Sequence, residues 1–247
     1  MAGPALLEAN GRAALVIGAS GGIGAAVASM LQDCGALVAG TARDAQRLPA
    51  ASESYLPLSV DATDEAAVAG AVSETVARFG QLDFAVNMAG IVGAGRLASM
   101  SLDDWNRVVD ANLTSCFLLA KHSYPHLKAS RGVVVLCSST NGINGGSHLS
   151  GAAYACSKAA ILNLNRYLAK EWAPDGIRVN CVVPGPVDTP MLDRLTEEQH
   201  QGIKKVLPLG RYATADEVAK ATVFLCSSAA ASMTGATINI SSGLVFD

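Results

Sequence analysis

The sequence lacks the long apolar runs and the charged blocks that mark membrane proteins and nucleic-acid-binding proteins. No apolar run approaches the roughly 20 residues that a helix needs to span a bilayer. Residues 1–10 show no basic start followed by an apolar stretch, so we expect no secretory signal. The 18 basic and 21 acidic residues are dispersed, without a basic stripe. We therefore expect neither a membrane nor a nucleic acid as partner.

Paired cysteines and metal-binding patterns are also missing. The six cysteines are scattered and form no C-x-x-C pair, which excludes a recognisable zinc site or disulfide framework. His122 and His126 stand four residues apart on a predicted helix, but no glutamate accompanies them in the zinc-protease arrangement and Pro125 interrupts the turn. We expect no metal site, and we expect reduced, mostly buried thiols in a cytoplasmic protein. The cysteines are Cys34, Cys116, Cys137, Cys156, Cys181 and Cys226.

What the sequence does contain is a regular alternation of short apolar runs and longer stretches of helical period. Half of the 247 residues are hydrophobic and 16% are charged, which is enough apolar material for one large core. The expected strands are Ala13–Gly18, Ala36–Thr41, Tyr55–Val60, Phe84–Asn87, Val133–Ser138, Ile177–Val183 and Ala236–Ile240. The expected helices are Gly22–Cys34, Asp64–Phe79, Leu102–Ala129, Ala152–Trp172 and Thr214–Ser228, of which the third should bend or end near Pro125.

This alternation predicts an α/β fold, a doubly wound, Rossmann-type parallel sheet of about seven strands with helices on both faces. No linker or change of composition divides the chain, so we expect a single dinucleotide-binding domain over residues 1–247. The least regular stretches, Gly142–Gly151 and Pro184–Leu209, follow strands at their carboxyl ends, where ligands bind in such sheets. We expect a substrate lid at about 190–209.

A glycine-rich turn between the first strand and the first helix predicts a dinucleotide site. A sharp turn that lets the backbone approach a pyrophosphate needs residues without Cβ, and the N-terminus of the following helix offers free N–H groups to the anion. The segment that meets these demands is Gly18-Ala19-Ser20-Gly21-Gly22-Ile23-Gly24, of which all but Ala19 are expected to contact the cofactor.

The end of the second expected strand indicates which dinucleotide binds. An acidic residue there would hold the ribose hydroxyls of NAD, but this sequence has Ala42 followed by Arg43. A guanidinium suits a 2′-phosphate, which favours NADP(H). NAD(H) is the less favoured alternative, because Asp44 is close enough in sequence to reach the ribose.

Five motifs occur in a fixed order along the chain. After the glycine turn come Asn87-Met88-Ala89-Gly90, then Asn112, then Ser139, then Tyr154-x-x-x-Lys158, and finally Pro184–Pro190. This succession resembles the short-chain dehydrogenase/reductase family from about residue 12 to the end. The resemblance implies an oxidoreductase that transfers a hydride between a nicotinamide and the carbonyl or secondary alcohol carbon of a small molecule.

The resemblance also implies a role for each catalytic residue. Tyr154 would be the general acid in reduction and the base in oxidation, and the ammonium of Lys158 would stabilise its anion and bind the nicotinamide ribose. Ser139 would hydrogen-bond the substrate oxygen, and Asn112 would hold a water that links Lys158 to solvent. The further cofactor contacts that it implies are Asp61, Ala62, Asn87, Ala89, Gly90, Pro184, Gly185, Val187 and Thr189.

Two ambiguities arise within these motifs. Tyr124 and Lys128 also form a Tyr-x-x-x-Lys match, but it precedes the fifth strand and contains Pro125, so we interpret it as a chance match. The interval from Ser139 to Tyr154 is about two residues longer than usual in the family, which leaves Ser138 as an alternative to Ser139. We favour Ser139 because Gly142 then has its usual offset.

The substrate is constrained only by class. Relatives that reduce carrier-bound thioesters often have a basic residue near the end of the tyrosine-bearing helix, but this chain has Asp175 there, which favours a free small molecule. The expected pocket lining is Ile143, Leu149, Pro186, Met191 and Leu195. The family further implies a homotetramer built through the third and fourth expected helices. A catalytically silent, nucleotide-sensing protein of the same fold is the alternative hypothesis.

Overall fold

The computed structural model describes residues 9–246, and these fold around one seven-stranded sheet. All its strands are parallel, in the order β3-β2-β1-β4-β5-β6-β9. The strands are β1 (Ala13–Ile17), β2 (Leu37–Ala42), β3 (Tyr55–Ser59), β4 (Phe84–Asn87), β5 (Val133–Cys137), β6 (Arg178–Pro184) and β9 (Thr237–Ile240). The predicted doubly wound α/β sheet is confirmed, with each strand within one residue of its expected start. The expectation about a secretory signal falls largely on residues 1–8, outside the described residues.

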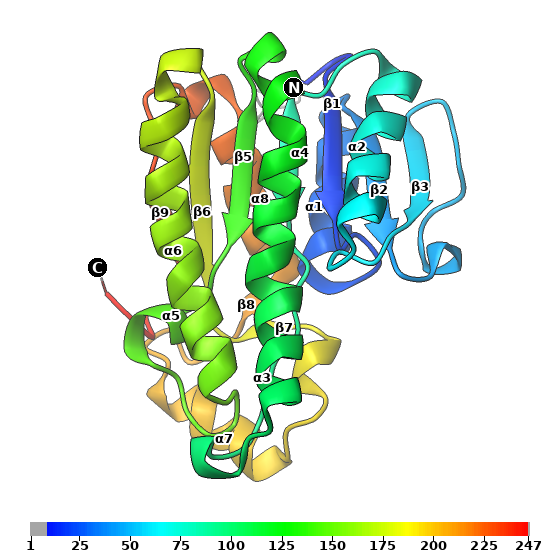
Figure 1. The fold of residues 1–247 in the computed structure, drawn as a ribbon. Helices are drawn as coiled ribbons and strands as arrows, with labels where there is room; N and C mark the ends of the chain where they lie inside the picture. The colour runs from blue at the N-terminus through cyan, green and yellow to red at the C-terminus, as the bar shows by residue number, and fades with distance from the viewer. Residues whose placement is uncertain (1–8, 247) are drawn as a thin grey trace.

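Helices cover both faces of the sheet (Figure 1). One face carries α1 (Gly22–Asp33) and α8 (Ala215–Cys226). The other face carries α2 (Glu65–Phe79), α4 (Ser115–Ser130) and α6 (Ala152–Trp172). The central strands β1, β4 and β5 are buried on both faces, which explains why they read as continuous apolar runs in the sequence.

The third expected helix is divided differently from the prediction. It consists of α3 (Leu102–Val109), one π-helical turn at Asp110–Thr114, and α4, which continues to Ser130. The helix therefore does not end near Pro125, contrary to the expectation. Pro125 and Lys121 both lie on the exposed side of α4, where water can pair with the Lys121 carbonyl that proline cannot satisfy. The irregularity falls instead on the turn that contains Asn112.

Smaller elements gather at the carboxyl ends of the strands, at the bottom of the view in Figure 1. They are α5 (Asn141–Asn144), α7 (Glu197–Val206) and a two-stranded parallel pair of β7 (Val187–Asp188) with β8 (Ala213–Thr214). The segment of the expected lid therefore contains a helix, α7, and a short turn at Pro190–Leu192. The polar residues Glu197, Glu198, Lys204 and Lys205 predict the polar face of a lid helix, and they do lie on α7, none of whose residues is buried.

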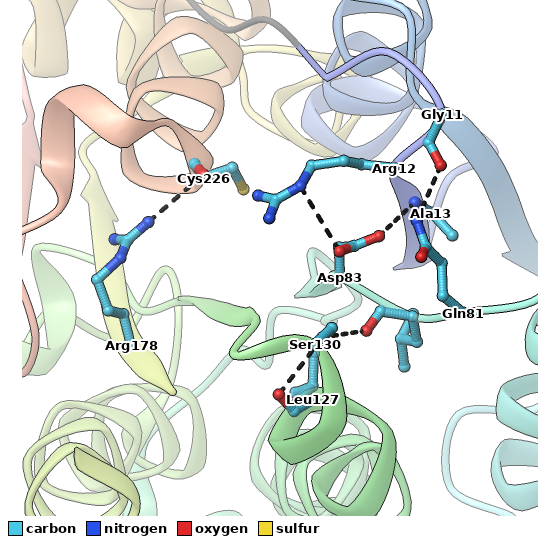
Figure 2. A network of polar contacts seen from close by, with 10 residues as sticks. Gly11, Arg12, Ala13, Gln81, Asp83, Leu127, Ser130, Arg178 and Cys226 are labelled. Atoms are coloured by element: carbon cyan, nitrogen blue, oxygen red, sulfur yellow. Dashed lines mark hydrogen bonds and ion pairs between the residues drawn. The ribbon is translucent and has the colours of Figure 1, made fainter. Parts of the chain in front are cut away.

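Polar side chains fix the opposite edge, where the strands begin (Figure 2). The buried carboxylate of Asp83 accepts a hydrogen bond of 2.8 Å from the Ala13 amide and pairs with Arg12 at 3.6 Å. Arg178 donates to carbonyls at the end of α8, among them those of Leu225 and Cys226. These contacts tie the starts of β1, β4 and β6 to their neighbours and leave the carboxyl edge free for a ligand site.

None of the helices within residues 9–246 combines the length and the apolar character that crossing a bilayer requires.

Candidate functional site

The glycine-rich turn between β1 and α1 is built for close approach of backbones. Gly18 has φ +84°, and a Cβ there would lie 2.7 Å from the Ala89 amide nitrogen. A Cβ on Gly24 would overlap the Gly18 carbonyl oxygen, so α1 starts directly against the turn. Gly22, with φ +53°, faces the methyl group of Thr189. These glycines keep open a cradle of backbone at the N-terminus of α1, which fits a pyrophosphate.

A single cleft of about 940 Å³ runs from this turn across the carboxyl ends of the strands. It contains the glycine turn, Ser139, Tyr154 and Lys158 together. The expected cofactor contacts that line it are Gly18, Ser20, Gly21, Gly22, Ile23, Gly24, Arg43, Asp61, Ala62, Ala89, Gly90, Pro184, Gly185, Val187 and Thr189. The volume and the extended shape suit a dinucleotide with a small second ligand.

Tyr154 and Lys158 lie one turn apart near the start of α6. The Lys158 ammonium is 5.7 Å from the centre of the Tyr154 ring and donates a hydrogen bond of 2.8 Å to the Cys137 carbonyl. Burial alone lowers the pKa of Lys158, but its electrostatic interactions with Cys137 and Tyr154 raise it, and on balance the pKa lies above its usual value. The buried lysine therefore carries a positive charge at neutral pH, next to the phenol.

The two candidate serines after β5 have different environments. The Ser138 hydroxyl donates a hydrogen bond of 2.7 Å to the Lys158 carbonyl and so ties β5 to α6. The Ser139 hydroxyl accepts one of 3.2 Å from the Asn141 amide, which leaves its own proton available to a ligand in the cleft. Gly142 packs so closely on the backbone of Lys158 that a Cβ there would come within 2.6 Å. This contact fixes the serine-bearing turn against α6.

Asn112 and Asn87 lie behind the cleft rather than along its wall. The Asn112 side chain accepts from the Ile91 amide at 2.8 Å and donates to the Ile91 carbonyl and the Ser157 hydroxyl. Asn87 accepts from the Ala89 amide at 2.9 Å and donates to the Ser115 hydroxyl. Both asparagines are buried and hold the 87–91 segment in place, so this segment connects the glycine turn to the lysine.

The end of the cleft at which the sequence predicted the adenosine lies beyond β2 and β3. Arg43 follows β2 and lines the cleft, and Asp61 follows β3. The amide and hydroxyl of Thr63 donate to the Asp61 carboxylate at 2.9 and 2.8 Å and hold its pKa below the usual value, with a smaller contribution from Arg43. Asp61 is therefore an oriented hydrogen-bond acceptor in this end of the cleft.

Other predicted residues lie elsewhere. The Tyr124 hydroxyl donates to Asp175 at 2.6 Å and its ring packs on Trp172, outside the cleft, as its interpretation as a chance match requires. Ile143 is exposed outside the cleft, so its expected place in the pocket lining was wrong. Leu149, Pro186, Met191 and Leu195 do line it. In the part of the chain that the structure describes, no three His, Cys, Asp or Glu side chains lie together so that they could hold a metal ion.

Sequence reasoning missed several residues that line the cleft. Arg47 lies in a short turn after β2, four residues beyond Arg43. Arg194 and the apolar residues Ile203 and Val206 come from the expected lid segment. The position of Arg47 near the end of β2 was a usable signal, because a second basic residue there also faces the adenosine end. For the lid, the sequence predicted the segment but not which of its side chains line the cleft.

The fold and the cleft define a nucleotide-binding α/β domain with a tyrosine, a lysine and a serine at one end of its ligand site. Residues 18–245 match the family model described as Enoyl-(Acyl carrier protein) reductase. The 3-oxoacyl-[acyl-carrier-protein] reductase of Escherichia coli is 38% identical over 243 residues, 95% of this chain and 98% of that protein. The cis-4-hydroxycyclohexanecarboxylate dehydrogenase of Sinomonas cyclohexanicum is 37% identical, over 94% of this chain and 96% of that protein.

A solved structure of an acyl-carrier-protein reductase has the same fold as this chain. The 3-ketoacyl-(acyl-carrier-protein) reductase of Brucella melitensis, crystallised with NADH, superposes with a TM-score of 0.88 at 28% identity and covers 96% of this chain and 99% of that chain. The chain belongs to the short-chain dehydrogenase/reductase family, as its motifs predicted. It is thus related along almost its whole length to oxidoreductases.

Proposed function

We propose that the chain is an NADP(H)-dependent oxidoreductase acting on the carbonyl or secondary alcohol carbon of a free small molecule, with Tyr154 as general acid and base. One observation carries this proposal. Tyr154, Lys158 and Ser139 share a single cleft with the glycine turn that fits a pyrophosphate. A protein that only binds a nucleotide has no need for all three groups at the far end of that cleft.

The bound nicotinamide would supply or accept the hydride. In reduction, Tyr154 would give its proton to the carbonyl oxygen while the Ser139 hydroxyl donates a hydrogen bond to the same oxygen. The Lys158 ammonium would stabilise the phenolate that results, because it is buried beside the half-buried Tyr154 and solvent screens the pair only weakly. Asn112 would contribute to returning a proton from solvent through a water, and its bonds to Ile91 position the lysine's surroundings.

The preference for NADP(H) is supported by the charge at the adenosine end. Arg43 and Arg47 both line the cleft beyond β2, where a 2′-phosphate would sit. A guanidinium pairs with phosphate through two parallel hydrogen bonds, whereas the ribose of NAD would be expected to meet an acidic residue at the end of β2. Ala42 occupies that position and offers no acceptor.

A free substrate is supported by the surroundings of Asp175. Its carboxylate pairs with Lys128 at 2.8 Å and accepts from Tyr124. This place beyond the end of α6 therefore carries an acid whose partners are already fixed, rather than an unpaired base for an acidic carrier. The Sinomonas relative, named for a free hydroxy acid, shows that relatives of this similarity include proteins with such substrates.

We propose a cytoplasmic homotetramer as the working form. The helices through which family members associate correspond to α4 and α6. Phe117 on α4 is 49% exposed and Tyr167 on α6 is 61% exposed, which leaves apolar surface on both helices. Leu168 and Trp172, by contrast, are buried within the chain's own core.

The test is the oxidation of NADPH and NADH, followed by absorbance, across a panel of ketones, aldehydes, β-ketoesters and diketones. We expect turnover with a preference for NADPH, and we expect the Arg43→Ala variant to lose about tenfold or more in kcat/KM for NADPH, with little change for NADH. A preference for NADH would contradict the role of Arg43. Tight cofactor binding without turnover of any compound would favour the nucleotide-sensing alternative.

A further inference from the structure

Arg194 lines the cleft beside the turn that leads to Tyr154, whereas Arg43 and Arg47 line it beyond β2. It belongs to the segment between the turn at Pro190–Leu192 and α7, and it lines the same cleft as Tyr154. Its guanidinium donates a hydrogen bond of 2.6 Å to the carbonyl of Leu149, five residues before Tyr154. Arg43 follows β2, three strands away in the sheet from β5, which leads to Ser139. Arg194 is therefore placed to meet a substrate rather than the cofactor phosphates.

Most N–H donors of the Arg194 guanidinium have no acceptor within residues 9–246. It carries five N–H groups, and only the one to Leu149 is accounted for within residues 9–246. No carboxylate pairs with it in the part of the chain that the structure describes, whereas Arg107, another arginine of the cleft, lies 3.4 Å from Asp104. The two aspartates among the described cleft residues, Asp61 and Asp110, follow β3 and begin the π-helical turn. Within residues 9–246, Arg194 is thus a positive charge in the cleft that no carboxylate pairs with.

The Arg194 side chain is exposed and shares the cleft with apolar side chains. Leu149, Met191 and Leu195 line the cleft with it, as do Ile203 and Val206 of α7. Helix α7 is attached to the body of the protein by His200, whose Nδ1 lies 2.9 Å from the Tyr212 hydroxyl. The Leu149 carbonyl therefore holds the guanidinium of Arg194, and the contact between His200 and Tyr212 holds the helix that follows Arg194 in the chain. A guanidinium in a partly apolar, anchored wall favours a planar anion that can accept two hydrogen bonds.

We propose that Arg194 binds a carboxylate on the substrate, so that the chain acts on keto acids or hydroxy acids in preference to neutral ketones and alcohols. This inference rests on the proposed function, because it names the substrate class of the same site. Arg194 would fix the end of the substrate away from the reacting carbon and set its distance from Tyr154.

The test compares a homologous series of keto acids with their methyl esters: 4-oxopentanoate, 6-oxoheptanoate and 8-oxononanoate, each with NADPH. We expect the wild type to favour the acid over the ester, with the ratio of kcat/KM largest at one chain length. Arg194→Met should lower kcat/KM for the preferred acid by about tenfold or more and change that for the ester less than about twofold. Arg194→Lys should retain part of the preference, because it keeps the charge but not the two parallel donors.

Two controls separate the charge from a structural role. Arg78→Met removes an arginine that also donates to a loop carbonyl, that of Ser52, but lies on α2 outside the cleft, and it should leave the acid-to-ester ratio unchanged. Calorimetric titration of the NADPH-loaded protein with hexanoate and methyl hexanoate measures recognition without turnover. We expect hexanoate to bind and Arg194→Met to abolish its binding.

Several results would overturn the inference. Equal losses for acids and esters in Arg194→Met would assign the arginine to holding Leu149 and the lid segment alone. An equal loss with acetoacetyl-coenzyme A would assign it to the phosphates of a carrier arm. If neutral ketones are turned over well without any preference for acids, the inference fails while the proposed function stands. If no ketone is turned over yet hexanoate binds through Arg194, the proposed function fails and the carboxylate site stands.

Discussion

At Gly24 the first turn of α1 touches the backbone of the glycine-rich turn. Because a Cβ would overlap the Gly18 carbonyl, we expect Gly24→Ala to push α1 away from the turn. The variant should lose about 1–3 kcal/mol of unfolding free energy, as overpacked sites do. It should also bind NADPH more weakly. Urea denaturation and titration of NADPH fluorescence measure the two effects.

Gly70 provides the matched control for this substitution. It lies within α2, and no atom outside its own helix backbone comes within 4 Å of where its Cβ would be. Gly70→Ala should therefore raise the unfolding free energy by about 0.5–1 kcal/mol through helix propensity and leave cofactor binding unchanged. If Gly24→Ala behaves like Gly70→Ala, the close approach of α1 to the turn is not what the cofactor site requires.

Individual residues also show how much of the candidate site could be predicted from the sequence. Gly18, Arg43, Ser139, Tyr154 and Lys158 follow recognisable patterns, and the structure brings all of them to one cleft. Nothing in the sequence predicted that the side chains of Asn87 and Asn112 would hydrogen-bond to the backbone amides of Ala89 and Ile91. Such partners depend on distances between segments that are remote in the chain, which no local pattern encodes.

Among the helices, α8 begins with a charge-dependent cap. Thr214 accepts from the Glu217 amide, and the Glu217 side chain accepts from the Thr214 amide and pairs with Arg211 at 2.7 Å. The bond from Arg211 and the Thr214 amide lower the pKa of Glu217 from 4.5 to about 2. Since the pKa is depressed on folding, the stabilisation is present above about 4.5 and is lost as the pH falls toward 2.

We therefore expect Glu217→Gln to lower the melting temperature at pH 7 by an amount that stays nearly constant down to about pH 4.5 and shrinks as the pH falls further. The effect should be modest, because the pair lies at the surface and is screened by water and salt. Thr214→Ala should cost about 1 kcal/mol with little dependence on pH, since its hydroxyl does not titrate. Melting curves between pH 7 and pH 3.5 compare the two variants. A difference for Glu217→Gln that is constant over this range would contradict the charged cap.

The elements of the sheet were more predictable than those around the site. Buried parallel strands are apolar on both faces, so β1, β4 and β5 stand out in the sequence. The π-helical turn at Asp110–Thr114 and the pair of β7 with β8 have no such signal, because tertiary contacts at the cleft determine them. Pro125 shows the opposite case. Proline is a strong local signal for the end of a helix, but α4 continues past it to Ser130, on a side of the helix that water can reach.

In the whole molecule, the contacts that stabilise the sheet and the candidate ligand site lie at opposite edges of the sheet. The amino edge is held by Asp83, Arg12 and Arg178 (Figure 2), and the carboxyl edge holds the cleft and α7. This arrangement lets loops at the carboxyl edge differ among relatives while the sheet is unchanged. The sequence predicted this division because both irregular segments follow strands.

The proposed tetramer makes a prediction at the same scale. Tyr167 is 61% exposed on α6, so burying it against a second copy would be disrupted by a charge. We expect Tyr167→Glu to shift the chain from tetramer toward dimer or monomer in sedimentation velocity experiments. Lys220→Glu on α8, an exposed position away from α4 and α6, serves as the control and should leave the assembly as it is. A wild-type chain that sediments as a monomer at all concentrations would contradict the proposed assembly.

Tyr154→Phe tests the central claim most directly, because it removes one oxygen atom and leaves the ring beside Lys158. The measurement is kcat for reduction of the best keto substrate with NADPH, alongside the Kd for NADPH. We predict a loss of kcat by at least about a hundredfold, as for removal of a general acid, with the Kd changed less than about threefold. A variant that keeps wild-type turnover would contradict the account, since the proton would then come from another group.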